Sequence, residues 1–233
     1  MKIVLFDVDD TLLKIPHRIY VKASEEMFKK VYGLPGIHEF LIEIKGQPEC
    51  AIIKSVLEYA KRKGLKPKHT KITDTAHIVW ANATKKVLKK NPAEVLPGIK
   101  KLLEELSKRK NIKLGILSGN SYWRSKAKIE SAGLDKFFKN SKGELQGAFG
   151  NESTKRSQLI EIARKKIGQE TDRFILVDDS IIGAKMVKSM KLPAIMVATG
   201  KISKEVLLKY SPYVFSDFGE NRWKRAIKII EKL

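Results

Sequence analysis

The chain reads Ile3-Val4-Leu5-Phe6-Asp7-Val8-Asp9-Asp10-Thr11-Leu12-Leu13 near its start, a short apolar run that passes directly into a group of carboxylates. A buried strand has no structural need for these carboxylates, whereas open α/β sheets place their ligands at the C-terminal ends of their strands. Asp7 and Asp9, two residues apart, can hold a divalent cation and leave one oxygen free to attack a bound electrophile. The alternative interpretation is an Asp-rich turn that caps the next helix.

Apolar runs elsewhere in the chain predict further strands of the same sheet. Most of them lack polar–apolar alternation, which is typical of parallel strands covered on both faces. Amphipathic helical patterns lie between them, so the sequence predicts an α/β fold with a doubly wound, Rossmann-like parallel sheet. The five predicted strands are Ile3–Phe6, Ile112–Leu117, Phe174–Val177, Ala194–Val197 and Tyr213–Phe215.

One long segment interrupts this alternation. Residues 14–95 show no convincing strand pattern and at least three helical stripes, which are separated by turn signals. The α/β pattern resumes at Leu96-Pro97-Gly98. We therefore predict two domains: an α/β core of residues 1–13 and 96–233, and an all-helical cap of residues 14–95 that lies over the strand ends like a lid.

The composition is typical of a soluble globular protein with a substantial apolar core. Hydrophobic residues make up 42% of the 233 residues, and no apolar run approaches the ~20 residues that a membrane span needs. The first residues do not resemble a secretory signal. The single cysteine, Cys50, excludes an intrachain disulfide. These features predict a cytoplasmic protein with no membrane partner.

The strongly basic balance has two interpretations. A net charge of +21, from 47 basic and 26 acidic residues, is compatible with binding to nucleic acid or to an anionic substrate. The lysines, however, are scattered over every polar face, and no aromatic-rich recognition motif interleaves with them. A solvated, lysine-rich surface is therefore favoured, and a nucleic-acid partner is not expected.

Four polar segments each follow a strand or begin a helix of the predicted core. They are Asp7–Thr11, Ser118-Gly119-Asn120, Lys155-Arg156 and Asp178-Asp179-Ser180. The ends of parallel strands meet at one edge of a sheet, so these segments are expected to lie together. They offer carboxylates for a metal, a hydroxyl with neighbouring N–H groups for an oxyanion, and a fixed cation. This is the outline of a phosphoryl-transfer site.

With these segments, the chain resembles the haloacid dehalogenase-like (HAD) hydrolase superfamily. The Asp-x-Asp-x-Thr motif of that family is matched at residues 7–11, its second-motif Ser/Thr at Ser118, its basic residue at Lys155 or Arg156, and its acidic motif at Asp178-Asp179. The insertion resembles the alpha-helical cap of phosphoglycolate phosphatase-like members. The resemblance covers the core on both sides of that insertion.

The resemblance implies a role for each matched residue. Asp7 would be the nucleophile and would form an aspartyl-phosphate, while Asp9 would protonate the leaving oxygen and later activate water. A lysine or arginine would neutralise charge in the transition state. The residues expected to bind the phosphoryl group of the substrate are Thr11, Ser118, Gly119 and Asn120.

The same resemblance implies a Mg2+ ion, which suits an all-oxygen site. Its expected ligands are Asp7, the backbone carbonyl of Asp9, and the acidic pair. Asp179 is assigned first as a ligand, with Asp178 as a second ligand or as the partner of the basic residue, and the reverse order stays open.

Further choices are left open by the sequence. Lys155 has the residue type usual in the family, whereas Arg156 lies one helical turn before an apolar pair. Arg156 is slightly favoured as the basic residue of the site. The segment Gly46-Gln47-Pro48-Glu49 falls where similar caps place a substrate-reading loop, although it also reads as a plain helix-initiating turn. His17 and Arg18 are weaker candidates for contact with the substrate, and Trp123 and Arg124 are weaker candidates for the border of the pocket.

The sequence as a whole predicts a Mg2+-dependent phosphatase that acts on a small phosphorylated metabolite. Phosphoglycolate is the default substrate by resemblance alone. One alternative is a phosphomutase of the same superfamily, which returns the phosphoryl group to a bound intermediate instead of to water. A second alternative is a non-catalytic protein that binds anions or nucleic acid through its positive charge.

Overall fold

The computed structural model describes residues 1–44 and 46–233, without the side chains of residues 17–19, 38, 42 and 43. The suggestion that His17 and Arg18 reach the substrate therefore concerns side chains outside this description. A sheet of six strands lies at the centre of the described chain, in the order β5-β4-β1-β6-β7-β8. The strands are β1 (Lys2–Phe6), β4 (Ile112–Ser118), β5 (Gly147–Phe149), β6 (Arg173–Asp178), β7 (Ala194–Val197) and β8 (Val214–Phe215).

Every pair of neighbouring strands in this sheet is parallel. The prediction of a parallel sheet is confirmed, and five of its strands match the predicted runs within one residue at each end. Strand β5 was missed because it has only three residues and begins with a glycine. Gly147, at φ 140°, lies so close to strand β4 that an added Cβ would sit 1.9 Å from the carbonyl oxygen of Ile116.

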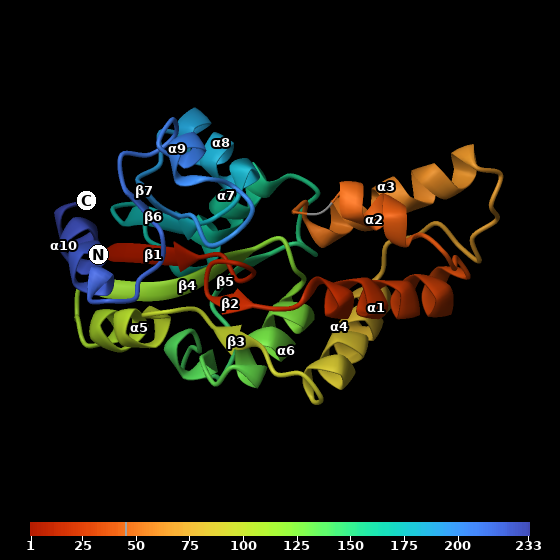
Figure 1. Cartoon of the computed structure of the whole chain (residues 1–233), viewed down its shortest axis with the longest axis horizontal. Coiled ribbons are helices and arrows are strands. Elements are labelled where there is room, and N and C mark those ends of the chain that lie inside the picture. The colour runs from red at the N-terminus through yellow and green to blue at the C-terminus, as the bar shows by residue number, and fades with distance from the viewer. Residues whose placement is uncertain (45) are drawn as a thin grey trace.

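Helices cover both faces of the sheet, as a doubly wound fold requires (Figure 1). Successive residues of β1 point to opposite faces: Val4 and Phe6 join the hydrophobic cluster on one side, and Ile3 and Leu5 join the cluster on the other. On the first side lie α5 (Ile99–Ser107), α6 (Tyr122–Ser131), the short 3-10 helix η2 (Asp135–Phe137) and α10 (Arg222–Lys232). On the second lie α7 (Arg156–Ile167), α8 (Ile181–Ser189) and α9 (Lys204–Leu207).

A helical insertion separates β1 from the rest of the core. It starts and ends at a short antiparallel pair of strands, β2 (Leu13–Lys14) and β3 (Glu94–Val95). In Figure 1 it projects beyond the C-terminal end of β1, on the side opposite the two chain termini. Its elements are α1 (His17–Met27), the π-helical turn η1 (Phe28–Tyr32), α2 (His38–Glu43), α3 (Glu49–Arg62) and α4 (Asp74–Leu88).

The helical insertion has a hydrophobic cluster of its own. Trp80, Phe28 and Ile53 are fully buried in it, and it is distinct from the two clusters on the faces of the sheet. The insertion contacts the core mainly through α4, which packs along α6. Within the described residues, each helix is too short or too polar to traverse a lipid bilayer.

Candidate active site

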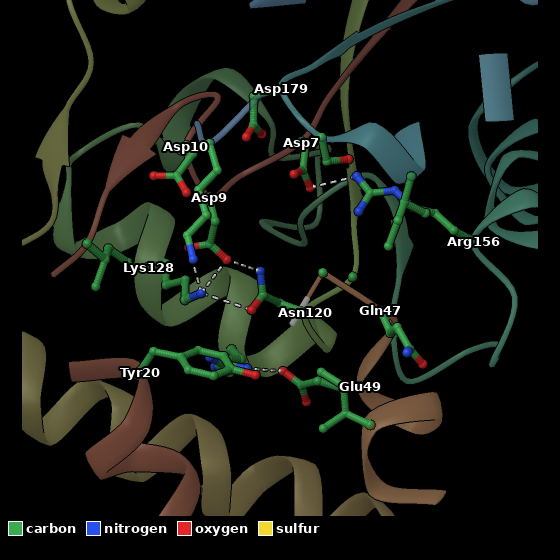
Figure 2. A pocket seen from close by; sticks show the side chains of 18 of the residues that line it. Asp7, Asp9, Asp10, Tyr20, Gln47, Glu49, Asn120, Lys128, Arg156 and Asp179 are labelled. Carbon is green, nitrogen blue, oxygen red and sulfur yellow. Dashed lines mark hydrogen bonds and ion pairs between the residues drawn. The ribbon is translucent and has the colours of Figure 1, made fainter. Parts of the chain in front are cut away.

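Three buried carboxylates meet at the C-terminal edge of the sheet. Asp7 follows β1, and Asp178 and Asp179 come from the end of the neighbouring strand β6. Each of these side chains offers an oxygen, and the three oxygens all lie within 4.8 Å of one another. Asp7 and Asp179 lie near each other at one end of a cavity (Figure 2).

A single guanidinium group faces two of these carboxylates. The Nη2 atom of Arg156 lies 3.1 Å from Asp7 Oδ1 and 2.6 Å from Asp178 Oδ2, and the arginine side chain is buried. Arg156 is the first residue of α7, which turns it toward the strand ends. Lys155 precedes the helix with an extended backbone and is exposed. The structure therefore brings Arg156, and not Lys155, to the carboxylates.

The carboxylates at this edge outnumber the cation. Burial raises the pKa of Asp7 to about 7, since the opposing effect of Arg156 is outweighed by burial together with Asp178 and Asp9. Burial also raises the pKa of Asp179 well above its usual value, and the neighbouring Asp178 and Asp7 raise it further. An all-oxygen group of carboxylates that repel one another fits a divalent cation such as Mg2+.

Asp9 lies in a different arrangement from the other carboxylates. Its oxygens accept hydrogen bonds from Lys128 Nζ at 2.6 and 2.8 Å and from Asn120 Nδ2 at 2.8 Å (Figure 2). Although burial would raise the pKa of Asp9, Lys128 and Arg124 lower it to about 2. The Asp9 carboxylate is thus held by protein cations, and of the Asp9 atoms only the backbone carbonyl stays a candidate metal ligand.

Lys128 is a site residue that sequence reasoning missed. It is buried in α6, and burial lowers its pKa to about 8 despite the neighbouring Asp9. The available signal is its spacing from Arg124, because residues four apart share one face of a helix. Two buried cations on the inward face of α6 are unusual enough to indicate a partner of opposite charge.

Thr11 and Ser118 are buried beside the site and do not line the cavity among the described residues. Thr11 Oγ1 donates to Asp179 Oδ1 at 3.0 Å, and Ser118 Oγ accepts hydrogen bonds from the N–H and the amide of Asn120. Thr11 therefore uses its O–H on Asp179, whereas Ser118 is the acceptor in both of its hydrogen bonds. Gly119 and Asn120, in contrast, do line the cavity.

The cavity is enclosed by the core on one side and by the helical insertion on the other. It has a volume of about 330 Å3. Figure 2 shows Tyr20 and Glu49, both from the insertion, across from Asp7 and Asp179. The apolar wall of the cavity consists of Ile15, Ile52, Ile181, Ile182 and Ile202.

The segment of residues 46–49 makes backbone contacts with the core. The N–H of Glu49 donates to the carbonyl of Gly119 at 2.8 Å, and the N–H of Cys50 donates to the carbonyl of Gly150 at 2.9 Å. The backbones lie so close here that a Cβ on Gly150 would come within 2.8 Å of the backbone nitrogen of Glu49. The predicted substrate-reading loop thus lies directly against the second motif.

Side chains reinforce this contact with a buried ionic group. Glu49 Oε1 accepts from Arg124 Nη1 at 3.0 Å, and Glu49 Oε2 lies 2.9 Å from His77 Nδ1. Burial would raise the pKa of Glu49, but His77 and Arg124 lower it. Burial would lower the pKa of His77, but Cys50 and Glu49 raise it to about 9. This group therefore comprises one carboxylate and two cations.

The fold and the site define a class of protein. A parallel α/β sheet with buried carboxylates at its C-terminal edge, beneath an inserted group of helices, is the framework of an α/β enzyme. The family model described as haloacid dehalogenase-like hydrolase matches residues 1–191, and the chain belongs to this family of hydrolases. The prediction of a HAD-type enzyme is confirmed.

Solved structures share this fold across nearly the whole chain. CbbY from Rhodobacter sphaeroides in complex with phosphate has a TM-score of 0.68 at 17% identity, covering 94% of this chain and 96% of its own. A Bacteroides vulgatus protein provisionally named beta-phosphoglucomutase has a TM-score of 0.64 at 15% identity, covering 100% and 89%. A provisionally named phosphatase of Clostridium acetobutylicum has 0.62 at 19%, covering 97% and 98%. No curated protein sequence matches the chain significantly.

Proposed function

We propose that this hydrolase is a Mg2+-dependent phosphatase of a small phosphorylated metabolite, acting through an aspartyl-phosphate on Asp7. The observation that carries the proposal is the group of three buried carboxylates with oxygens within 4.8 Å of one another, two of which pair with Arg156 and two of which line the cavity. Such a group is costly to bury without a cation. It also places Asp7, the proposed nucleophile, next to positive charge that would stabilise the oxygens of a bound phosphoryl group.

The residues of the chain divide the reaction between them. Asp7 attacks phosphorus, so that the P–O bond to the leaving group breaks as the bond to the Asp7 oxygen forms. Asp9 donates a proton to the leaving oxygen, after the nearby phosphate dianion has raised its proton affinity. Asp9 then takes a proton from the water that hydrolyses the aspartyl-phosphate. Arg156 and the Gly119 N–H group stabilise the phosphoryl oxygens.

The donor set also fits the metal. Asp7 and Asp179, which face the cavity, would hold Mg2+ together with the backbone carbonyl of Asp9, while Asp178 is shared with Arg156. When bound, Mg2+ supplies positive charge to the transferring phosphoryl group. The excess of carboxylates at this position supports its binding.

Residues 14–95 are proposed to act as a cap. Four of their helices form the insertion that encloses the cavity, and enclosure excludes water while Asp7 carries the phosphoryl group. A cavity of about 330 Å3 accommodates a small metabolite. Phosphoglycolate remains a prediction that rests on the resemblance, as does the location in the cytoplasm.

The test is release of inorganic phosphate from an aryl phosphate and from a panel of small phosphate esters, with Mg2+ and with EDTA. We expect release that requires Mg2+ and is lost with EDTA. Turnover only in the presence of a bisphosphate activator would support the phosphomutase instead, a candidate favoured by the fold shared with the Bacteroides vulgatus protein. No release from any ester, with salt-dependent binding to DNA or RNA, would support the non-catalytic alternative.

A further inference from the structure

The contact between the helical insertion and the core centres on one arginine. Arg124 belongs to α6 of the core, but the groups around it come from the insertion. Its guanidinium carbon lies 4.9 Å from the ring centre of Tyr20 and 4.5 Å from that of Trp80, and its Nη1 donates to Glu49. Arg124 is 1% exposed, so the core side chain is fully inserted into a socket of the insertion.

His77 completes this socket from α4. It contacts the second oxygen of Glu49 through Nδ1, and its ring stacks on Trp123 of α6 at 6.3 Å between centroids. Its Nε2 lies 3.8 Å from the sulfur of Cys50, which in turn donates to the carbonyl oxygen of Asn151 at 3.3 Å. Each side chain of the insertion in this group therefore faces a partner in the core or another member of the group.

The rest of the joint combines apolar contact with open space. Most buried apolar residues of the insertion form a cluster of their own, while Leu88 of α4 is buried in a cluster of the core. A second hollow of about 380 Å3 lies between α4 and α6. It is lined by Ile78, Ala81, Asn82, Lys85, Trp123, Lys126, Ala127 and Glu130.

These observations have an energetic consequence. Removal of one partner from a buried ionic group is strongly destabilising, whereas separation of the whole group returns each charge to water and offsets much of the lost attraction. Interfaces of this polar kind allow relative motion of the parts they join. The ionic group is also adjacent to the cavity, because Glu49, Arg124 and Tyr20 line its wall.

We propose that Glu49, Arg124 and His77 form a clamp that holds the helical insertion closed over the cavity, with Glu49 as the positioning residue. The clamp touches none of the carboxylates of the proposed metal site. It sets the fraction of molecules in which the cavity is enclosed, and its effect on turnover rests on the proposed function.

Cys50 provides a direct measure of this closure. It is the single cysteine of the chain, it belongs to the insertion, and its sulfur contacts the core at Asn151. Because Cys50 is partly exposed in the closed structure, iodoacetamide alkylates it at a basal rate, and an increase over that rate reports separation of the two parts without any need for turnover. Glu49→Gln removes the charge and keeps the volume. Glu58→Gln, on the exposed face of the same helix, is the matched control.

We expect alkylation of Cys50 to be about 10-fold faster in Glu49→Gln than in wild type, with Glu58→Gln unchanged. In steady-state kinetics, KM for the best ester should rise about 10-fold while kcat changes less than about 3-fold, since substrate binding draws the open molecules closed. Loss of kcat alone with unchanged alkylation would overturn the clamp. Absence of turnover in wild type would reject the phosphatase proposal. The alkylation rates alone would then decide whether the clamp exists.

A second variant guards against misfolding of the first. His77→Gln leaves the Glu49–Arg124 pair in place and removes the contacts of the imidazole ring with Glu49, Cys50 and Trp123. With native circular dichroism, it should accelerate alkylation to a smaller extent than Glu49→Gln. An alkylation rate equal to that of wild type in both folded variants contradicts the proposal.

Discussion

The two buried ionic groups of this protein are built in opposite ways. At the C-terminal edge of the sheet, Arg156 pairs with Asp7 and Asp178 but not with Asp179, and burial with mutual repulsion raises the pKa of Asp7 to about 7. At the joint with the helical insertion, one carboxylate serves two cations, and the pKa of that carboxylate is lowered. The first group has more carboxylates than cations, and the second has more cations than carboxylates.

This difference separates a binding site from a joint. A group with excess carboxylates gains stability from a cation or from protons, so its properties depend on what is bound. A group whose carboxylate is doubly paired needs no ligand and instead stabilises the contact in which it lies. Changes to the first group should therefore affect chemistry, and changes to the second should affect closure and stability.

The largest expected effect is that of Asp7→Asn. Because the substitution removes the nucleophilic oxygen and little volume, turnover should fall by at least about 10⁴-fold while the fold persists. The measurement is phosphate release with Mg2+ and the best ester, alongside a thermal melt. Asp135→Asn, which breaks a surface pair with Lys139, is the control and should retain activity. Substantial turnover in Asp7→Asn would refute its assignment as nucleophile.

A comparison of the two adjacent cations comes next. Arg156→Ala should lower kcat by about 10²- to 10³-fold, because it removes the charge that faces Asp7 and the phosphoryl group. Lys155→Ala should change kcat by less than about twofold, since the lysine is exposed. Both values come from steady-state assays under the same conditions. Equal and small losses would mean that the cation of the site lies elsewhere.

Addition of Mg2+ should distinguish the two groups by stability. At a hundred times its Kd, the ion should stabilise the fold by ~2.7 kcal/mol. This corresponds to a rise in Tm of about 5–10 °C for a chain of this size. Asp179→Asn should abolish the rise and Glu49→Gln should retain it.

The affinity for Mg2+ should also depend on pH. Because Asp7 must lose its proton to bind a cation, and its pKa is about 7, this affinity should increase as pH rises through 7. An affinity that is constant from pH 6 to 8 would contradict this.

The smallest effect concerns pH and the joint. The pKa of His77 is about 9 in the folded protein against a usual value of 6.5, so its contribution to stability is fully present below pH 6.5 and is lost as pH rises through 9. In His77→Gln, Tm should therefore decline a few degrees less than in wild type between pH 6.5 and 9. The groups that face this ring are Glu49 and Cys50. Parallel Tm profiles would show that His77 is uncharged.

Sequence patterns identified the features that depend on local order. The strands of the core could be predicted because their apolar runs are continuous, and residue spacing placed the carboxylates at the strand ends. The β2–β3 pair and strand β5 could not, because strands of two or three residues carry no periodicity.

The socket of Arg124 could not be predicted either. Its partners, Glu49 and His77, lie on two different helices of the insertion, and neither helix has a pattern that indicates a charged partner. Lys128 escaped for the same reason, since its partner Asp9 lies at the far end of the chain in sequence and meets it only in the folded structure. Burial of a charge is a property of tertiary packing, whereas the motifs at the strand ends are properties of the chain.

The short β2–β3 pair has a consequence for the order in which the chain folds. Strand β1 pairs directly with β4, although the whole helical insertion lies between them, and closing so long a loop is entropically unfavourable. The insertion contains its own hydrophobic cluster, and its first and last helices, α1 and α4, pack against each other. Once it has formed, the β2–β3 pair holds its two ends together, and the loop that remains between β1 and β4 is short. Early folding of the insertion would thus speed assembly of the sheet.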